Sequence, residues 1–168
     1  MAKASGRLQR WTDSVLGHFT WDERGVWNGS CEFNDRTVRL ELDPDNTDPS
    51  REEQLAVFEL SRPVLAQLRE VEPEFRRRAV EQIAAAVVAQ QPRGRGRVTL
   101  PKDRFAAGLE LETVSIHGCG ELHYRSPEFF PGWVVTVYFD EDQSFGDAEV
   151  YEPRGRAERT AAPDRPRD

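Results

Sequence analysis

Apolar and polar side chains alternate along three short runs near the start of the chain. Residues 15–21, 27–33 and 37–42 carry apolar or small side chains at every second position, with mostly polar side chains between them. Alternation with a period of two is typical of antiparallel strands that bury one face. The pattern therefore predicts three strands joined by turns. The residues expected to share the core-facing side are Val15, Gly17, Phe19, Trp21, Trp27, Gly29, Cys31, Phe33, Val38, Leu40 and Leu42.

A helical pattern follows the third run. Ser50 and Glu53 have the spacing of a capping box, which predicts a helix that begins directly after Ser50. Pro63 removes a backbone donor, so we expect a kink or a short break near Ser61. Pro73 suits the first turn of a helix, so a second helix is predicted to begin there.

The second half of the chain returns to strand-like patterns after a short third helix, which is predicted over 101–109. Four more strands are expected at 111–117, 121–125, 133–140 and 147–152. The order of elements predicts an α+β domain. Its antiparallel sheet of about six to seven strands combines N- and C-terminal strand groups, and two longer helices and one short helix pack on one face.

The sequence predicts one domain over residues 14–152. Residues 1–13 are expected to form a partly disordered N-terminal segment. Residues 153–168 contain no large apolar side chain, so we expect a disordered tail there.

The segment SIHGCGELHY allows a prediction of hairpin register. Val114, Ile116, Leu122 and Tyr124 are expected to face the core. A three-residue loop over 118–120 would pair Ile116 with Leu122 and Val114 with Tyr124. A two-residue loop would set core residues opposite polar ones, so the three-residue loop is favoured.

The chain is acidic, with 23 Lys and Arg against 30 Asp and Glu and a net charge of −7. Residues 153–168 carry five Arg and three acids, a charge of +2, so the remainder carries −9. Binding to a duplex needs clustered Lys and Arg, so nucleic acid is an unlikely partner. The basic stretches at 76–78 and 93–97 are interpreted as a solvated helix face and loop.

The remaining composition predicts a cytoplasmic protein. We find no apolar run long enough to span a membrane and no apolar stretch behind the N-terminal charges. The two cysteines, Cys31 and Cys119, do not indicate a secreted disulfide scaffold.

Three residues come nearest to a metal site. His117, Cys119 and His123 offer imidazole and thiolate ligands, which suit zinc, and a bend could bring them together. Their spacing matches no familiar zinc pattern and no fourth ligand is evident, so we expect neither a metal site nor a cofactor. The acidic loops that begin at Asp43 and Asp140 lack the glycine and the final Glu of a calcium-binding EF-hand.

No strong catalytic motif is present. The sequence lacks G-x-S-x-G, P-loop and G-x-G-x-x-G patterns. Asp13, Ser14 and His18 lie too close together along the chain to adopt the geometry of a catalytic triad. Paired carboxylates remain an open route to acid–base chemistry because acids are plentiful.

The segment EFFPGW, residues 128–133, has two interpretations, a loop that starts a strand, which is favoured, and the rim of a partner-binding surface. Gly132 allows the backbone to turn at the start of a strand, and Pro131 stiffens the approach. Trp133 is expected to join the core face of that strand, whereas Phe129 and Phe130 remain in the loop. Exposed aromatic residues cluster at interfaces, so Phe129, Phe130 and Trp133 are the candidate partner-binding residues.

The C-terminal half, FAAGLELETVSIHGCGELHYRSPEFFPGWVVTVYFDEDQSFGDAEVYE, resembles bacterial proteins of domain of unknown function 2262. The resemblance implies a short helix, an acidic-aromatic hairpin, a Phe-Trp-Gly-His element and a hydrophobic strand, and it covers about residues 14–152. Pro131 and Trp133 stand where that element has Trp and His, so a function that needs the imidazole would be absent here. The resemblance implies no activity, although related bacterial families include immunity proteins and accessory modules.

These observations favour a non-catalytic cytoplasmic module that binds an unidentified protein partner, in an immunity or regulatory role. The alternative is a hydrolase that uses acidic residues or the face with His117 and His123, with or without a metal ion.

Overall fold

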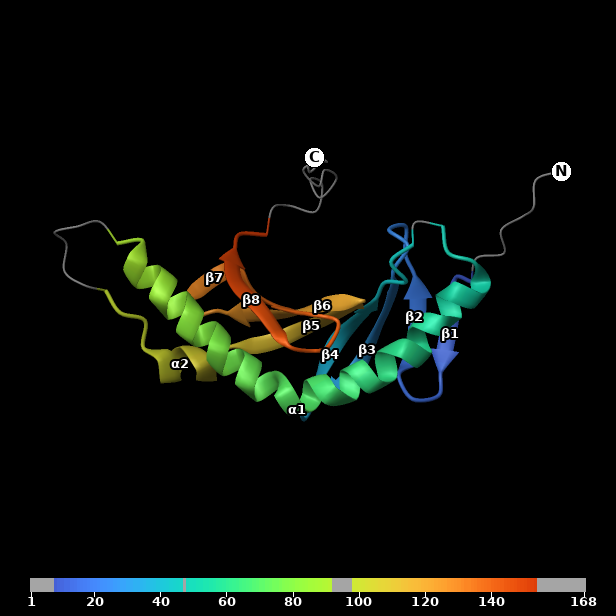
Figure 1. Ribbon diagram of the computed structural model, residues 1–168, viewed down its shortest axis with the longest axis horizontal. Helices are drawn as coiled ribbons and strands as arrows, with labels where there is room; N and C mark the ends of the chain where they lie inside the picture. Colours follow the sequence, from blue (N-terminus) through green and yellow to red (C-terminus); the bar gives the residue numbers. More distant parts are fainter. Residues whose placement is uncertain (1–7, 47, 92–97, 154–168) are drawn as a thin grey trace.

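The computed structural model describes residues 8–46, 48–91 and 98–153, and their strands form a single eight-stranded sheet (Figure 1). The spatial order of the strands is their order in the chain. Neighbouring strands are antiparallel except β4 and β5, which are parallel. The strands are β1 (Arg10–Asp13), β2 (Gly17–Trp21), β3 (Trp27–Phe33), β4 (Arg36–Leu42), β5 (Glu110–His117), β6 (Cys119–Ser126), β7 (Phe130–Phe139) and β8 (Phe145–Tyr151). The two helices are α1 (Arg51–Ala89) and α2 (Lys102–Ala107).

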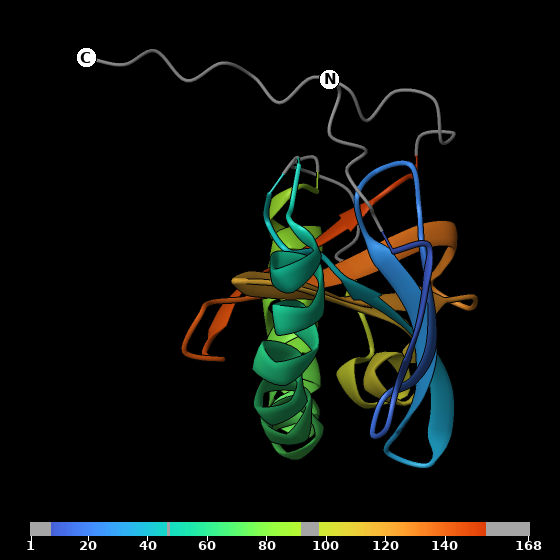
Figure 2. The same ribbon diagram turned by 90° about the vertical axis from the view of Figure 1, so that its right-hand side faces the viewer.

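The predicted α+β class is confirmed, and so is the sheet built from two strand groups. The strand count was too low, because β1 lies within residues 1–13, which were expected to form a partly disordered N-terminal segment. The sheet is mixed rather than antiparallel, because the chain crosses from β4 to β5 through α1 and therefore enters β5 in the same direction. Figures 1 and 2 show α1 running past both strand groups. Neither described helix has the length and apolar character needed to cross a membrane.

The prediction of two longer helices was wrong, because α1 continues through both Pro63 and Pro73. Its start was predicted correctly. The Ser50 hydroxyl accepts from the Glu53 amide at 3.2 Å, and the Glu53 carboxylate accepts from the Ser50 amide at 2.6 Å. Figure 1 shows that α1 bends near its middle, which is the form that a helix with internal prolines commonly takes.

The turn between β3 and β4 supports this bend. Pro73 has no backbone N–H, so the carbonyl of Arg69 loses its usual helical donor. The Asn34 side-chain amide donates to that carbonyl at 2.9 Å. Asn34 and Asp35 have φ of 45° and 67°, as two-residue hairpin turns require. The Arg69 guanidinium in turn donates to the Glu32 carbonyl at 2.6 Å. Two hydrogen bonds therefore connect the β3–β4 hairpin to α1.

A single apolar core lies between the sheet and α1, and both strand groups contribute to it. Trp27, Phe33, Val135 and Val137 are at most 1% exposed, which confirms the predicted core faces of β3 and β7. The Trp27 indole N–H donates to the Gln54 carbonyl of α1 at 2.9 Å. Val15 was misassigned, since it precedes β2 and is 70% exposed.

The predicted β5–β6 register was wrong by two residues. Val114 pairs with Leu122, and Ile116 pairs with Gly120. A two-residue shift keeps every side chain on its predicted face, which is why alternation alone did not distinguish the registers. The side-chain space at Gly120 is filled from β7, because a Cβ there would lie 2.3 Å from the Phe139 ring.

Candidate functional site

A groove of about 460 Å³ lies between the second half of α1 and the strands β7 and β8. Its walls are mostly apolar, and its polar groups come from two glutamines and one glutamate. The lining residues are Gln82, Ile83, Ala86, Val87, Gln90, Phe130, Trp133, Ala148, Glu149 and Val150. The groove thus contains two of the three residues that the sequence proposed for partner binding.

A bulge at the start of β7 places Trp133 at this groove. Arg125 of β6 pairs with Val134 and Ser126 pairs with Phe130, so residues 131–133 have no partner in β6. Gly132 allows this detour with φ of 79°. The expectation that Trp133 is core was therefore wrong, since its side chain lies beyond the regular strand and is 42% exposed.

Phe129 and Phe130 are half-buried rather than free in the loop. Their rings pack edge-on against Phe105 of α2, with centroid distances of 5.4 and 5.5 Å. Phe105 itself is fully buried. Phe130 is consequently an anchored wall of the groove, whereas Phe129 contacts α2 outside it.

The other exposed large apolar residues among those described do not line this groove. Val15, Leu60 and Val98 are 64% to 70% exposed. Single exposed apolar residues are normal on protein surfaces. Trp133 differs from these three because it borders an apolar groove.

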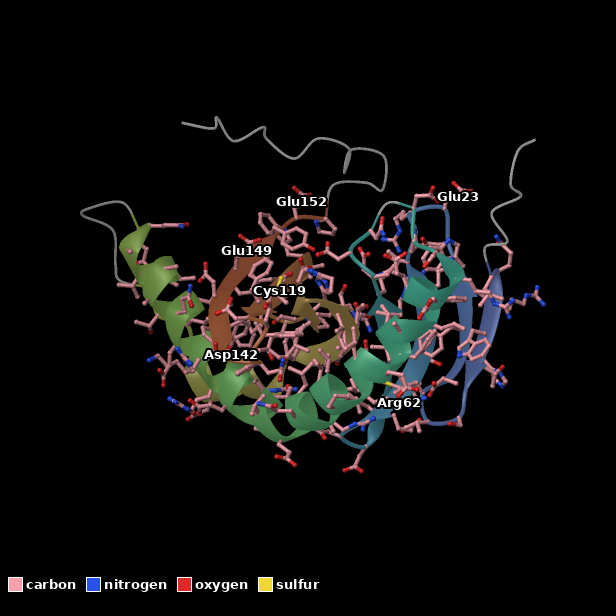
Figure 3. The ribbon with its side chains drawn as sticks, turned by 45° about the vertical axis from the view of Figure 1, so that its right-hand side comes forward. Glu23, Arg62, Cys119, Asp142, Glu149 and Glu152 are labelled. Carbon is pink, nitrogen blue, oxygen red and sulfur yellow. The ribbon has the colours of Figure 1, made fainter. Side chains whose placement is uncertain are left out.

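The suggested metal ligands do not gather into a site. His117 Nδ1 and Cys119 Sγ lie 3.5 Å apart, but His123 contacts Glu121 at 2.9 Å and Thr136 at 3.2 Å. The described residues contain no cluster of three metal-ligating side chains. Figure 3 shows Cys119 on the C-terminal half of the sheet.

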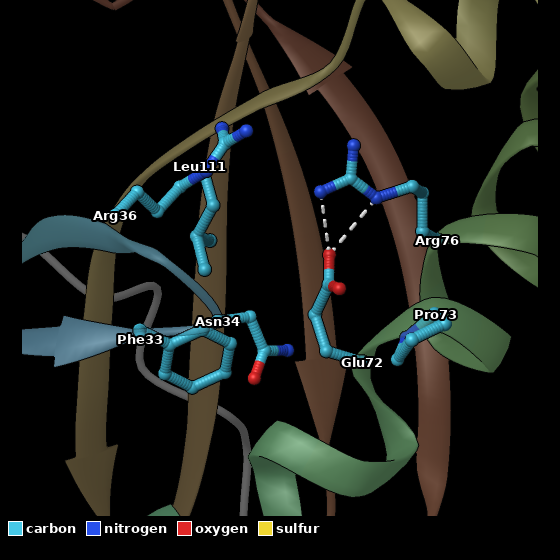
Figure 4. A pocket seen from close by; sticks show the side chains of 7 residues that line it. All are labelled: Phe33, Asn34, Arg36, Glu72, Pro73, Arg76 and Leu111. Atoms are coloured by element: carbon cyan, nitrogen blue, oxygen red, sulfur yellow. Dashed lines mark hydrogen bonds and ion pairs between the residues drawn. The ribbon is translucent and has the colours of Figure 1, made fainter.

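A second cleft, of about 330 Å³, lies beside the bend of α1 and contains the charged residues Arg36, Glu72 and Arg76 (Figure 4). Glu72 is 5% exposed and accepts hydrogen bonds from the Tyr124 hydroxyl and the Arg76 Nε, each at 2.9 Å. Arg76 also donates to the carbonyl of Leu109 at 2.6 Å, which ties α1 to the segment after α2. Burial, and then the neighbouring Glu72 carboxylate, raise the pKa of Tyr124 well above its usual value.

This cleft was not predicted from the sequence, although a signal was present. Glu72 lies three and seven positions before Phe75 and Ala79, so it belongs to the apolar stripe of α1. Arg76 follows Glu72 at the spacing of a helical ion pair. An acid within an apolar stripe, with a cation one turn later, indicates a buried pair.

The sheet, the bent helix across it and the aromatic groove define an α+β protein with an apolar groove on its surface. The chain belongs to DUF2262, a family of uncharacterized proteins conserved in bacteria, whose model matches residues 13–150. This match confirms the resemblance seen in the sequence. No curated protein and no solved structure gives a match.

Proposed function

We propose that this protein is a cytoplasmic, non-catalytic module that binds another protein through the Trp133 groove. The observation that carries the proposal is a large aromatic side chain, 42% exposed, at the mouth of an apolar hollow. Leaving such a side chain in water is unfavourable, so covering it contributes to association. Tryptophan is also enriched among the residues that dominate binding energies at interfaces.

The chemistry of the surroundings suggests the kind of partner. Glu149 lines the groove, and Asp147 on the same strand interacts with Gln82, another lining residue. The chain outside residues 153–168 carries −9. We infer a partner segment with a large apolar side chain flanked by Lys or Arg, because complementary charge speeds encounter and favours the correct partner. A module of this kind would act as an immunity protein or as a regulator of its partner.

The proposal is tested by affinity capture from the native bacterial lysate with quantitative mass spectrometry. The test variant is Trp133→Ser, and the matched control is Leu60→Ser, which removes an apolar side chain that is 69% exposed outside the groove. We expect a specific partner to be recovered with the wild type and the control, and at least tenfold less with Trp133→Ser. Equal recovery with both variants would remove the groove from the proposal.

A further inference from the structure

The sheet opens between its two strand groups, at the cleft beside Glu72. β4 and β5 pair only from Arg39 and Thr113 onward, so residues 36–38 and 110–112 are not paired with each other. Arg36 and Leu111 line the cleft of Figure 4. Arg36 and Leu111 also line a neighbouring cleft. Its other lining residues are Thr37, Glu110, Glu112 and Arg125. The gap between the strands therefore brings Arg36 to both clefts.

Arg36 differs from the other cations at this opening. Arg76 pairs with Glu72 at 2.8 Å, and Arg125 contacts Glu112 at 2.6 Å and Glu110 at 3.6 Å. Within residues 8–46, 48–91 and 98–153 we find no ion pair for Arg36. Arg36 shares the core-facing side of β4 with Val38 and Leu40 but remains exposed. In Figure 4 its guanidinium lies across the cleft from the Glu72–Arg76 pair.

The remaining walls are largely apolar. Phe33, Pro73 and Leu111 line the cleft, and Phe33 and Leu111 are at most 5% exposed. Arg36 and Arg76 together with Glu72 give the lining a charge of +1, in a chain that is otherwise acidic. A volume of about 330 Å³ is at the small end of ligand pockets.

We propose that this cleft binds a small organic monocarboxylate. The Arg36 guanidinium would hold the carboxylate, since its planar donor pair matches two carboxylate oxygens. The apolar body of the ligand would pack against Phe33, Pro73 and Leu111. A monoanion is favoured over a dianion because the Glu72 carboxylate lies on the same cleft and repels a second negative charge.

Benzoate is the probe, because it combines one carboxylate with a ring of suitable size. Amide resonances of the full-length ¹⁵N-labelled protein are followed during titration at low salt. We expect saturable shifts at Asn34 and Leu111 with a dissociation constant in the millimolar range. Arg36→Gln should weaken binding at least tenfold and Arg36→Lys less so. Arg51→Gln, which removes an exposed arginine outside both clefts, should leave binding unchanged.

Two analogues make the test specific. Benzyl alcohol, which lacks the charge, should bind at least tenfold more weakly than benzoate. Phenyl phosphate at pH 8, a dianion, should also bind more weakly, and tighter binding would overturn the choice of a monoanion. The absence of saturable shifts with benzoate, or equal affinity in Arg36→Gln, would overturn the site itself. Trp133→Ser should bind benzoate with the affinity of the wild type. The carboxylate cleft and the protein-binding groove can therefore be tested independently of each other.

Discussion

At the scale of single residues, Asn34 shows how one side chain can compensate for a proline some forty positions away. Asn34 occupies a left-handed turn position. Its side-chain amide donates a hydrogen bond to the carbonyl of Arg69, which Pro73 leaves without a helical donor. Asparagine is among the few residues other than glycine that adopt this backbone conformation easily. The backbone preference and the hydrogen bond can be separated by substitution.

We predict that Asn34→Ala lowers the free energy of unfolding by about 1–2 kcal/mol, because it loses the hydrogen bond and strains the turn. Asn34→Gly should cost less, about 0.5–1 kcal/mol, because it loses only the hydrogen bond. Urea unfolding monitored by tryptophan fluorescence measures both. Equal stability of Asn34→Ala and the wild type would show that the Asn34–Arg69 contact does not support the bend.

At the scale of elements, an ion pair fastens the β1–β2 hairpin to α1. Asp13 is 5% exposed and accepts from the Arg62 guanidinium at 2.5 Å and from the amides of Val15 and Leu16 at 2.9 Å each. Burial alone would raise the pKa of Asp13, but these donors outweigh it, and the pKa lies below its usual value. Figure 3 labels Arg62 on α1.

This ion pair predicts a specific dependence of stability on pH. A carboxyl with a lowered folded-state pKa contributes stability above its unfolded pKa, about 3.9, and loses it as pH falls through the folded value. We expect Asp13→Asn to lower the free energy of unfolding by about 1–3 kcal/mol at pH 7. The difference should shrink below about pH 4. Urea titrations from pH 7 to 2.5 measure it, and a constant difference across that range would contradict the assignment.

The Glu72 network is the second fastening between elements, because it joins α1 to β6 and to the segment after α2. Removing the acid leaves the Arg76 guanidinium and the buried Tyr124 hydroxyl without their shared acceptor. We expect Glu72→Ala to cost about 3–5 kcal/mol, whereas Tyr124→Phe, which loses one hydrogen bond, should cost about 1 kcal/mol. Thermal and urea unfolding compare the two. Similar costs would mean that Glu72 is not the centre of the network.

At the scale of the whole molecule, local sequence patterns predicted the positions of helices and strands better than the continuity of α1 and the register between strands. Alternation located the core faces around Trp27 and Val135, and the Ser50 capping box located the start of α1. The continuation of α1 through Pro73 is accompanied by a hydrogen bond from a distant side chain, Asn34, which a local pattern does not reveal. In the observed β5–β6 register Gly120 pairs with Ile116 and lies beside the Phe139 ring of β7, which is also a long-range contact.

The candidate site shows the same division. Phe129, Phe130 and Trp133 stood out as an aromatic cluster, but their surroundings were set by tertiary structure. The bulge at Gly132 moves Trp133 out of the core, and α2 secures the two phenylalanines. The second half of α1, which completes the groove, could not be placed opposite Trp133 from the sequence alone.

The central claim is that the Trp133 groove is the surface that meets a protein partner. Its most direct test is photo-crosslinking in living cells, with a benzophenone amino acid placed at Gln90 in the groove and, separately, at the exposed position Leu60. We expect a discrete crosslinked protein from position 90 that disappears when Trp133→Ser is added, and none from position 60. Crosslinking from position 60 alone, or adducts from position 90 that survive Trp133→Ser, would contradict it.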